Sequence, residues 1–216
     1  MPEQLKPKKN KNFRFQLNKS AMLYAESFST PFLLFIVDVS SQSAKSYFLW
    51  IQRYVSDVLD VRTPGWRDKK QRSFSVEIPD KNDISSGLEK IKAIASRPRL
   101  IQETVDFRDS YFHLSHQLDS AARRELSVDT ESLNHMRLLA KRIRNLKVIF
   151  KYNNCGIDKK CAEELLHFVE SLNTGSSRLD FLEHPHRHNF NLLANSLEGL
   201  GSVESFIAAN NGDTAY

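Results

Sequence analysis

The sequence predicts a mixed α/β fold in its first part and an all-α region after it, and two observations support this prediction. Up to about residue 95, segments with the period of strands alternate with segments that have the period of helices, as in α/β domains. After that point only helical periodicity is present. The run Arg97-Pro98-Arg99 separates the two patterns, so we expect one domain over residues 1–98 and a helical region over residues 99–216.

The first region is expected to hold four strands and three helices. Phe13, Phe15 and Leu17 alternate with polar residues, which is the period of a half-buried strand. The run at 32–39 is apolar on both faces, so we expect helices to cover both sides of its sheet. Asp83 is expected to cap the third helix. The strands are predicted at 13–17, 32–39, 45–50 and 74–78, and the helices at 19–27, 51–59 and 83–95.

The second region is expected to be a set of four helices. They are predicted at 100–126, 130–152, 158–173 and 190–208, the third capped by Asp158. The second and third helices each carry an apolar seam, so they are predicted to form an antiparallel hairpin that packs seam against seam.

The composition favours a folded protein without membrane-spanning segments. The chain has 216 residues, 40% of them hydrophobic and 14 of them Phe, which is enough for a packed core. Its two cysteines, Cys155 and Cys161, favour free thiols in a reducing compartment. Neither a signal-peptide pattern nor an apolar run long enough to span a bilayer is visible. We therefore expect a soluble, cytoplasmic protein with no membrane partner.

Positive charge is concentrated in the first half of the chain. The net charge is +5, and residues 1–100 contain 18 Lys and Arg against 10 Asp and Glu. A basic lobe attracts the phosphate backbone of DNA or RNA through long-range forces and counterion release. A solvated basic edge without a ligand is the alternative interpretation.

The order of segments between residues 4 and 79 resembles a known family. The segments are Gln4-Leu5-Lys6, Phe13-Arg14-Phe15-Gln16-Leu17, Pro31 to Val39, Tyr47 to Gln52 and Phe74 to Pro79. Together they resemble the C-terminal part of a bacterial domain-of-unknown-function family in the PD-(D/E)XK, or restriction-endonuclease-like, superfamily. The resemblance covers about residues 3–98. It implies a partial restriction-endonuclease-like sheet with flanking helices.

The resemblance also implies roles for individual residues. By this resemblance Gln4 and Lys6 would be the catalytic pair, and at a spacing of two on a strand their side chains would share one face. In the superfamily the first residue helps to hold a divalent metal, and the lysine orients or activates the attacking water. The cations that would contact the nucleic-acid backbone are Lys8, Lys9, Lys11 and Arg14. An intact member would be an Mg²⁺-dependent endonuclease that cleaves phosphodiesters.

One part of the family's site has no counterpart in this sequence. The family has an acidic residue on a strand upstream, whereas Gln4 offers Mg²⁺ only a neutral carbonyl. We therefore expect an N-terminally truncated fragment, or an inactive remnant, with no metal site of its own. The absent segment would leave a sheet edge and an apolar face uncovered. Two further Asp-x-Lys tripeptides, Asp68–Lys70 in a linker and Asp158–Lys160 at a helix cap, lack the right neighbours.

A second hypothesis assigns the chain to another class of protein. In it, the helical hairpin at residues 130–173 binds a partner protein, and the α/β half is a scaffold without chemistry. The apolar seams of the hairpin motivate this alternative, although the same seams can bury each other. The run His184-Pro185-His186-Arg187-His188 is expected to be a polar connector, because no carboxylate or thiolate stands beside it at ligand spacing.

Overall fold

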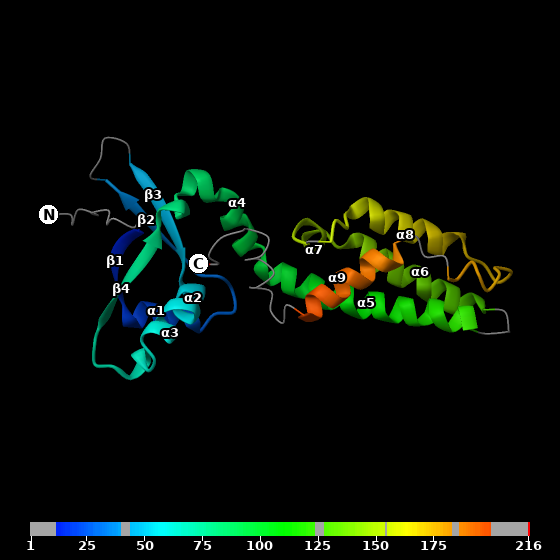
Figure 1. Cartoon of the computed structure of the whole chain (residues 1–216), viewed down its shortest axis with the longest axis horizontal. Helices are drawn as coiled ribbons and strands as arrows, with labels where there is room; N and C mark the ends of the chain where they lie inside the picture. The colour runs from blue at the N-terminus through cyan, green and yellow to red at the C-terminus, as the bar shows by residue number, and fades with distance from the viewer. Residues whose placement is uncertain (1–11, 40–43, 124–127, 154, 183–185, 200–215) are drawn as a thin grey trace. The chain divides into compact units, whose positions relative to one another are not determined.

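The computed structural model describes residues 12–39, 44–123, 128–153, 155–182, 186–199 and 216 (Figure 1). These residues form two compact units. The α/β unit contains the chain up to Pro98 together with Tyr216, and the helical unit begins at Arg99. The described residues mix helices with strands, which confirms the predicted mixed α/β class.

Two antiparallel strand pairs form the framework of the α/β unit. Strand β1 (Asn12–Asn18) pairs with β4 (Ser73–Pro79), and β2 (Leu33–Asp38) pairs with β3 (Lys45–Trp50). All four predicted strands are present, and each end lies within one residue of its predicted position. Within the described residues β2 pairs only with β3, so its second edge has no partner strand there.

Helical segments connect these strands. Helix α1 (Lys19–Glu26) follows β1 directly, and α4 (Ile84–Ala95) follows β4. The Asp83 side chain accepts a hydrogen bond from the Ser85 N–H, which confirms the predicted cap of α4. The helix predicted at 51–59 is longer than expected. It comprises α2 (Ile51–Tyr54), a π-helical turn η1 (Val55–Leu59) and α3 (Asp60–Arg62).

The β2–β3 pair has a buried face on each side, but the coverage is incomplete. One face joins the main core of the unit with Ile36, Tyr47 and Leu49. On the other face, Phe48 and Trp50 pack with Ile94 of α4. The side chains of Phe35 and Val37 are 51% and 52% exposed, respectively. The prediction that helices cover both faces of this strand is therefore wrong for its second half, because α4 packs on β3 and on the start of β2 only.

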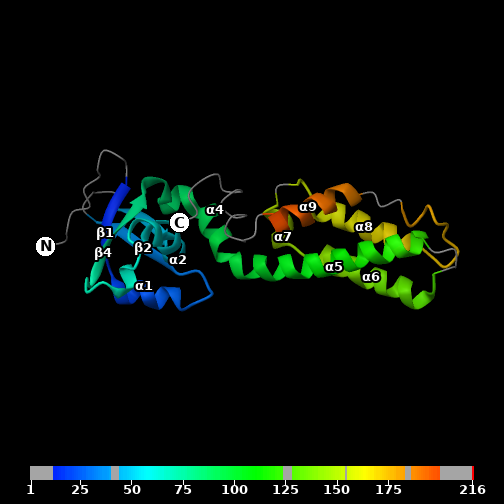
Figure 2. The same cartoon turned by 60° about the horizontal axis from the view of Figure 1, so that its bottom comes forward.

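The helical unit consists of five helices, counted over the described residues. They are α5 (Arg97–Arg123), which belongs to this unit from Arg99 onward, α6 (Thr130–Asn145), α7 (Val148–Lys151), α8 (Lys159–Ser171) and α9 (Arg187–Gly199). Helices α6 and α8 pack against each other with their apolar residues buried, which is the pairing predicted for residues 130–173. Figure 2 labels the helices of this unit. The Asp158 side chain accepts a hydrogen bond from the Cys161 N–H, as the predicted cap requires.

Two helix boundaries differ from the prediction. Helix α5 begins at Arg97 rather than near Leu100, because Pro98 falls in the first turn, where its missing N–H is not needed. The helix predicted at 130–152 is broken after Asn145. Leu146 adopts an extended backbone and is buried, and a new helix, α7, starts at Val148.

The predicted final helix is confirmed in part. Helix α9 ends at Gly199, and residues 200–208 of the prediction lie outside the described residues. Both cysteines have free thiols. Among the described helices, none has the length and apolar character needed to cross a bilayer.

Candidate functional site

Most of the predicted site lies in residues that the structure does not describe. This holds for the predicted catalytic pair Gln4 and Lys6 and for the predicted nucleic-acid contacts Lys8, Lys9 and Lys11. Arg14, the remaining predicted contact, lies on β1. The described residues contain no group of three or more His, Cys, Asp or Glu side chains that could hold a metal ion.

The charge of Arg14 is paired within the unit. Its Nε and Nη2 atoms donate to Glu77 Oε1 on β4, at 2.9 and 2.6 Å. Arg62 approaches the other oxygen of the same carboxylate at 3.5 Å. The hydrogen bonds from Arg14 outweigh the effect of burial and lower the pKa of Glu77. The Glu77 carboxylate thus stays ionised and pairs with the Arg14 guanidinium, the group that was predicted to contact the nucleic-acid backbone.

A second group of cations lies in a loop that the sequence analysis treated as a linker. This segment, Lys69 to Arg72, is called the basic loop here and connects the 3₁₀ turn η2 (Trp66–Asp68) to β4. All of its residues are exposed. Within the described residues, the side chains of Lys69, Lys70 and Arg72 have no hydrogen bond or ion pair. These three charges are therefore available to an anion.

The start of the basic loop is anchored in the core of the unit. Trp66 is fully buried and packs edge-on against Phe74, with ring centroids 5.5 Å apart. Its indole Nε1 donates to Asp60 Oδ1 at 2.9 Å. Gly65, just before it, has a φ of 70°, a left-handed conformation that glycine adopts without strain. The chain therefore enters the loop from a fixed position.

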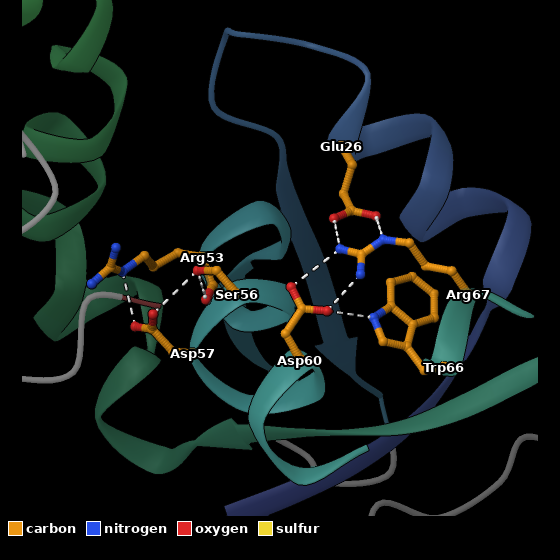
Figure 3. Close-up of polar contacts among 7 residues, drawn as sticks. All are labelled: Glu26, Arg53, Ser56, Asp57, Asp60, Trp66 and Arg67. Atoms are coloured by element: carbon orange, nitrogen blue, oxygen red, sulfur yellow. Dashed lines mark hydrogen bonds and ion pairs between the residues drawn. The ribbon is translucent and has the colours of Figure 1, made fainter. Parts of the chain in front are cut away.

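Arg67 strengthens this anchor by binding two carboxylates (Figure 3). Its Nη1 donates to Asp60 Oδ1 at 2.6 Å, and its Nε donates to Glu26 Oε2 at 3.2 Å. The hydrogen bonds to Asp60 and then to Glu26 raise the pKa of Arg67, and the same contact to Arg67 lowers the pKa of Asp60. The Glu26 and Asp60 carboxylates thus pair with Arg67, and within the described residues they form no ion pair with the basic loop.

The far end of the basic loop is held by the start of α1. The Lys19 main-chain N–H donates to the Arg72 carbonyl at 2.8 Å, and the Lys19 ammonium donates to the Lys69 carbonyl at 2.9 Å. The N-terminal end of a helix carries a partial positive charge. Lys19 and the dipole of α1 thus add to the positive potential beside the loop, against which Asp68 is the nearest acidic residue in the sequence.

This arrangement places three exposed cations where an anion can reach them. Three exposed cations on a loop fixed at both ends match a row of phosphates, whose contacts to Lys and Arg supply affinity without base recognition. In the sequence, Asp68–Lys70 stands out only as a nuclease-like tripeptide. The signal that could have predicted this loop is a basic run preceded by the pair Trp66-Arg67, which anchors it.

The hairpin at residues 130–173 offers less surface than its apolar seams suggested. The seam residues of α6 and α8 are buried between the helices, among them Met136, Leu139 and Leu165. Arg137, on the α6 flank, donates to the Leu172 carbonyl at 2.8 Å. The feature that motivated a protein-binding role is therefore used to hold the hairpin together.

Comparison of the chain with known protein families, with curated proteins and with solved structures finds no significant match. The relationship to restriction-endonuclease-like proteins therefore stays a prediction from the order of sequence segments.

Proposed function

We propose that this chain is a non-catalytic remnant of a nuclease-like protein, and that its α/β unit binds the phosphate backbone of a nucleic acid through the basic loop. The observation that carries the proposal is the set of three exposed, unpaired cations, Lys69, Lys70 and Arg72, on a loop anchored at both ends.

Anchoring matters because a mobile loop loses conformational freedom when it binds. Each long side chain that becomes ordered costs about 0.5–1.5 kcal/mol, and a fixed backbone avoids adding to that cost. The buried Trp66 ring, the Arg67 contacts and the two Lys19 hydrogen bonds fix the backbone of the basic loop before any ligand arrives.

The open edge of β2 supports the remnant part of the proposal. A sheet that has lost neighbouring elements is expected to expose a strand edge and apolar side chains. The second edge of β2 has no partner strand among the described residues, and Phe35 and Val37 are half exposed beside it. In this proposal the Gln4 and Lys6 pair is a remnant of a catalytic site, in which the neutral Gln4 carbonyl is a weak ligand for Mg²⁺.

The chain contains a matched pair of tripeptides for testing the proposal. Asp68-Lys69-Lys70 leads into the basic loop, and the identical Asp158-Lys159-Lys160 starts α8. In α8, Lys159 lies 3.2 Å from Glu163 and Lys160 lies 3.9 Å from Glu164, so both charges are paired. Alanine substitution of each lysine pair removes the same two charges from the same local sequence.

The measurement is fluorescence anisotropy of labelled single- and double-stranded DNA and RNA at several salt concentrations. Lys69→Ala/Lys70→Ala should weaken binding and reduce the slope of log K against log salt by about 2, one for each lost phosphate contact. Lys159→Ala/Lys160→Ala should leave affinity and slope close to those of the parent chain. Equal losses in both variants would show only a response to net charge and would overturn the proposal.

Catalysis is tested on the same protein with Mg²⁺ or Mn²⁺ and a nucleic-acid substrate. The proposal expects no cleavage, because the Gln4 side chain offers a divalent metal only a neutral carbonyl oxygen. Metal-dependent cleavage that disappears in Lys6→Ala would show an active nuclease and refute the assignment as a remnant.

A further inference from the structure

Tyr216 lies against the α/β unit, far from its neighbours in the sequence. The Lys90 ammonium on α4 donates to the main-chain oxygen of Tyr216 at 2.9 Å. The Asn82 side-chain amide donates to the same oxygen at 3.1 Å. Two donors from separate side chains thus converge on one oxygen atom.

The two donors hold each other in place. Asn82 is 1% exposed, and its Nδ2 also donates to the Phe48 carbonyl at 3.0 Å. Its Oδ1 accepts a hydrogen bond from the Lys90 ammonium at 3.0 Å. Because these contacts fix the amide and the ammonium without help from Tyr216, the oxygen-binding position is built into the fold.

An aromatic surface lies beside these donors. The rings of Tyr216 and Tyr54 meet edge to face, with centroids 5.3 Å apart and planes at 88°. Such a pair contributes about 0.5–1.5 kcal/mol beyond its buried area. Tyr54 is 3% exposed, and its hydroxyl accepts a hydrogen bond from the Glu77 N–H at 3.0 Å. Tyr216 also packs on the main core of the unit.

We propose that Tyr54, Asn82 and Lys90 form a binding site for an aromatic residue. Tyr54 contacts its ring, and Asn82 and Lys90 donate hydrogen bonds to its main-chain oxygen. Tyr216 of the same chain occupies this site. The site shares no residue with the basic loop and does not depend on nucleic-acid binding. Its ligand class is an aromatic amino-acid residue with an accessible carbonyl or carboxylate oxygen.

Occupation by the same chain gives a clear competition experiment. The probe is the peptide Asn-Gly-Asp-Thr-Ala-Tyr, which has the sequence of residues 211–216. It is titrated into the ¹⁵N-labelled full chain and into full-length Tyr216→Ala, and the side-chain amide signals of Asn82 are followed by NMR. The peptide should shift these signals in Tyr216→Ala. The parent chain should need at least about tenfold more peptide, because a tethered ligand competes at an effective concentration near the millimolar range.

Two controls test the chemistry of the site. In the Tyr216→Ala background, Lys90→Met should weaken peptide binding by about tenfold or more, because it removes a charged hydrogen-bond donor. Lys92→Met, on the same helix, removes a lysine that pairs with Glu89 and should not change it. A peptide with alanine in place of tyrosine should not bind to Tyr216→Ala, and this control needs no second substitution in the protein.

Three results would overturn the proposal. Equal binding of the peptide by the parent chain and Tyr216→Ala would show that Tyr216 does not occupy the site. Failure of the peptide to shift the Asn82 signals in folded Tyr216→Ala would show that there is no such site. A parent chain that is a dimer by light scattering, and becomes a monomer on Tyr216→Ala, would assign the bound tyrosine to a second copy and not to the same chain.

Discussion

The Glu103 carboxylate accepts a hydrogen bond from the main-chain N–H of Val148 at 2.6 Å. The same oxygen accepts from the N–H groups of Lys147 and Ile149 at 2.9 and 3.0 Å, and the other oxygen accepts from Arg99. Three N–H groups at the start of a helix are thereby satisfied by one side chain of α5, which lets α7 begin where α6 has ended.

Removing this carboxylate should destabilise the helical unit. Glu103 is 4% exposed, so Glu103→Ala leaves buried N–H groups without an acceptor and should lower the free energy of unfolding by about 3 kcal/mol. Glu163→Ala on α8 removes a partly exposed glutamate that pairs with Lys159 and should cost less than about 1 kcal/mol. Urea denaturation followed by circular dichroism measures both. Equal costs would show that Glu103 does not hold the α6–α7 junction.

The same carboxylate predicts how stability changes with pH. Burial by itself raises the pKa of Glu103, but the hydrogen bonds from Arg99 and from the N–H groups of α7 outweigh it, so the pKa lies below the ordinary value of 4.5. A carboxylate whose pKa is lower in the folded than in the unfolded protein stabilises the fold fully when the pH is above the unfolded-state pKa. This stabilisation is lost as the pH falls through the folded-state pKa. The stability difference between the parent chain and Glu103→Gln should therefore shrink below about pH 4.5. A difference that stays constant on acidification would contradict this assignment.

Gly87 on α4 should tolerate no side chain. A Cβ atom built on Gly87 would lie 2.5 Å from Cε1 of Phe48, whose ring is fully buried between α4 and β3. Gly87→Ala should destabilise the α/β unit by about 1–2 kcal/mol, since the cost of overpacking exceeds the gain in helix propensity. Ser86→Ala, at the adjacent position and exposed, should be neutral or slightly stabilising. Thermal denaturation compares the two variants, and a stabilised Gly87→Ala would show that α4 can move away from the sheet.

Arg67→Lys separates the position of the basic loop from its charge. A lysine keeps the charge but cannot bind Glu26 and Asp60 together, so the loop loses part of its anchor. Binding of DNA should weaken by a few-fold, while the salt slope stays unchanged because the number of phosphate contacts is the same. Arg53→Lys is the control, because Arg53 contacts the single carboxylate of Asp57 (Figure 3). A reduced salt slope in Arg67→Lys would show that phosphate contacts are lost together with the anchor, and would contradict this separation of position from charge.

Local patterns predicted the elements that depend on local interactions. The alternation of Phe74, Val76 and Ile78 with polar residues gives β4, and all three side chains are buried. The aspartates at 83 and 158 cap α4 and α8, because a cap needs only an N–H two or three residues away.

The features that escaped prediction depend on contacts between distant residues. The break between α6 and α7 follows from Glu103, more than forty residues earlier, and periodicity alone cannot show it. The anchoring of the basic loop requires Glu26 and Lys19 to lie beside residues 67–72, which the pairing of β1 with β4 brings about. The same limit applies to Asn82 and Tyr216, which lie 134 positions apart.

The pairing of β1 with β4 also sets the order in which the two units acquire structure. Phe13 lies opposite Ile78, so the chain between them must close a long loop before this ladder can form. The α6–α8 hairpin joins helices that are near neighbours in the sequence, and such contacts form quickly. In refolding from urea, the helical unit should therefore regain its native circular dichroism first. Formation of the ladder between β1 and β4 should limit the slower folding rate of the α/β unit.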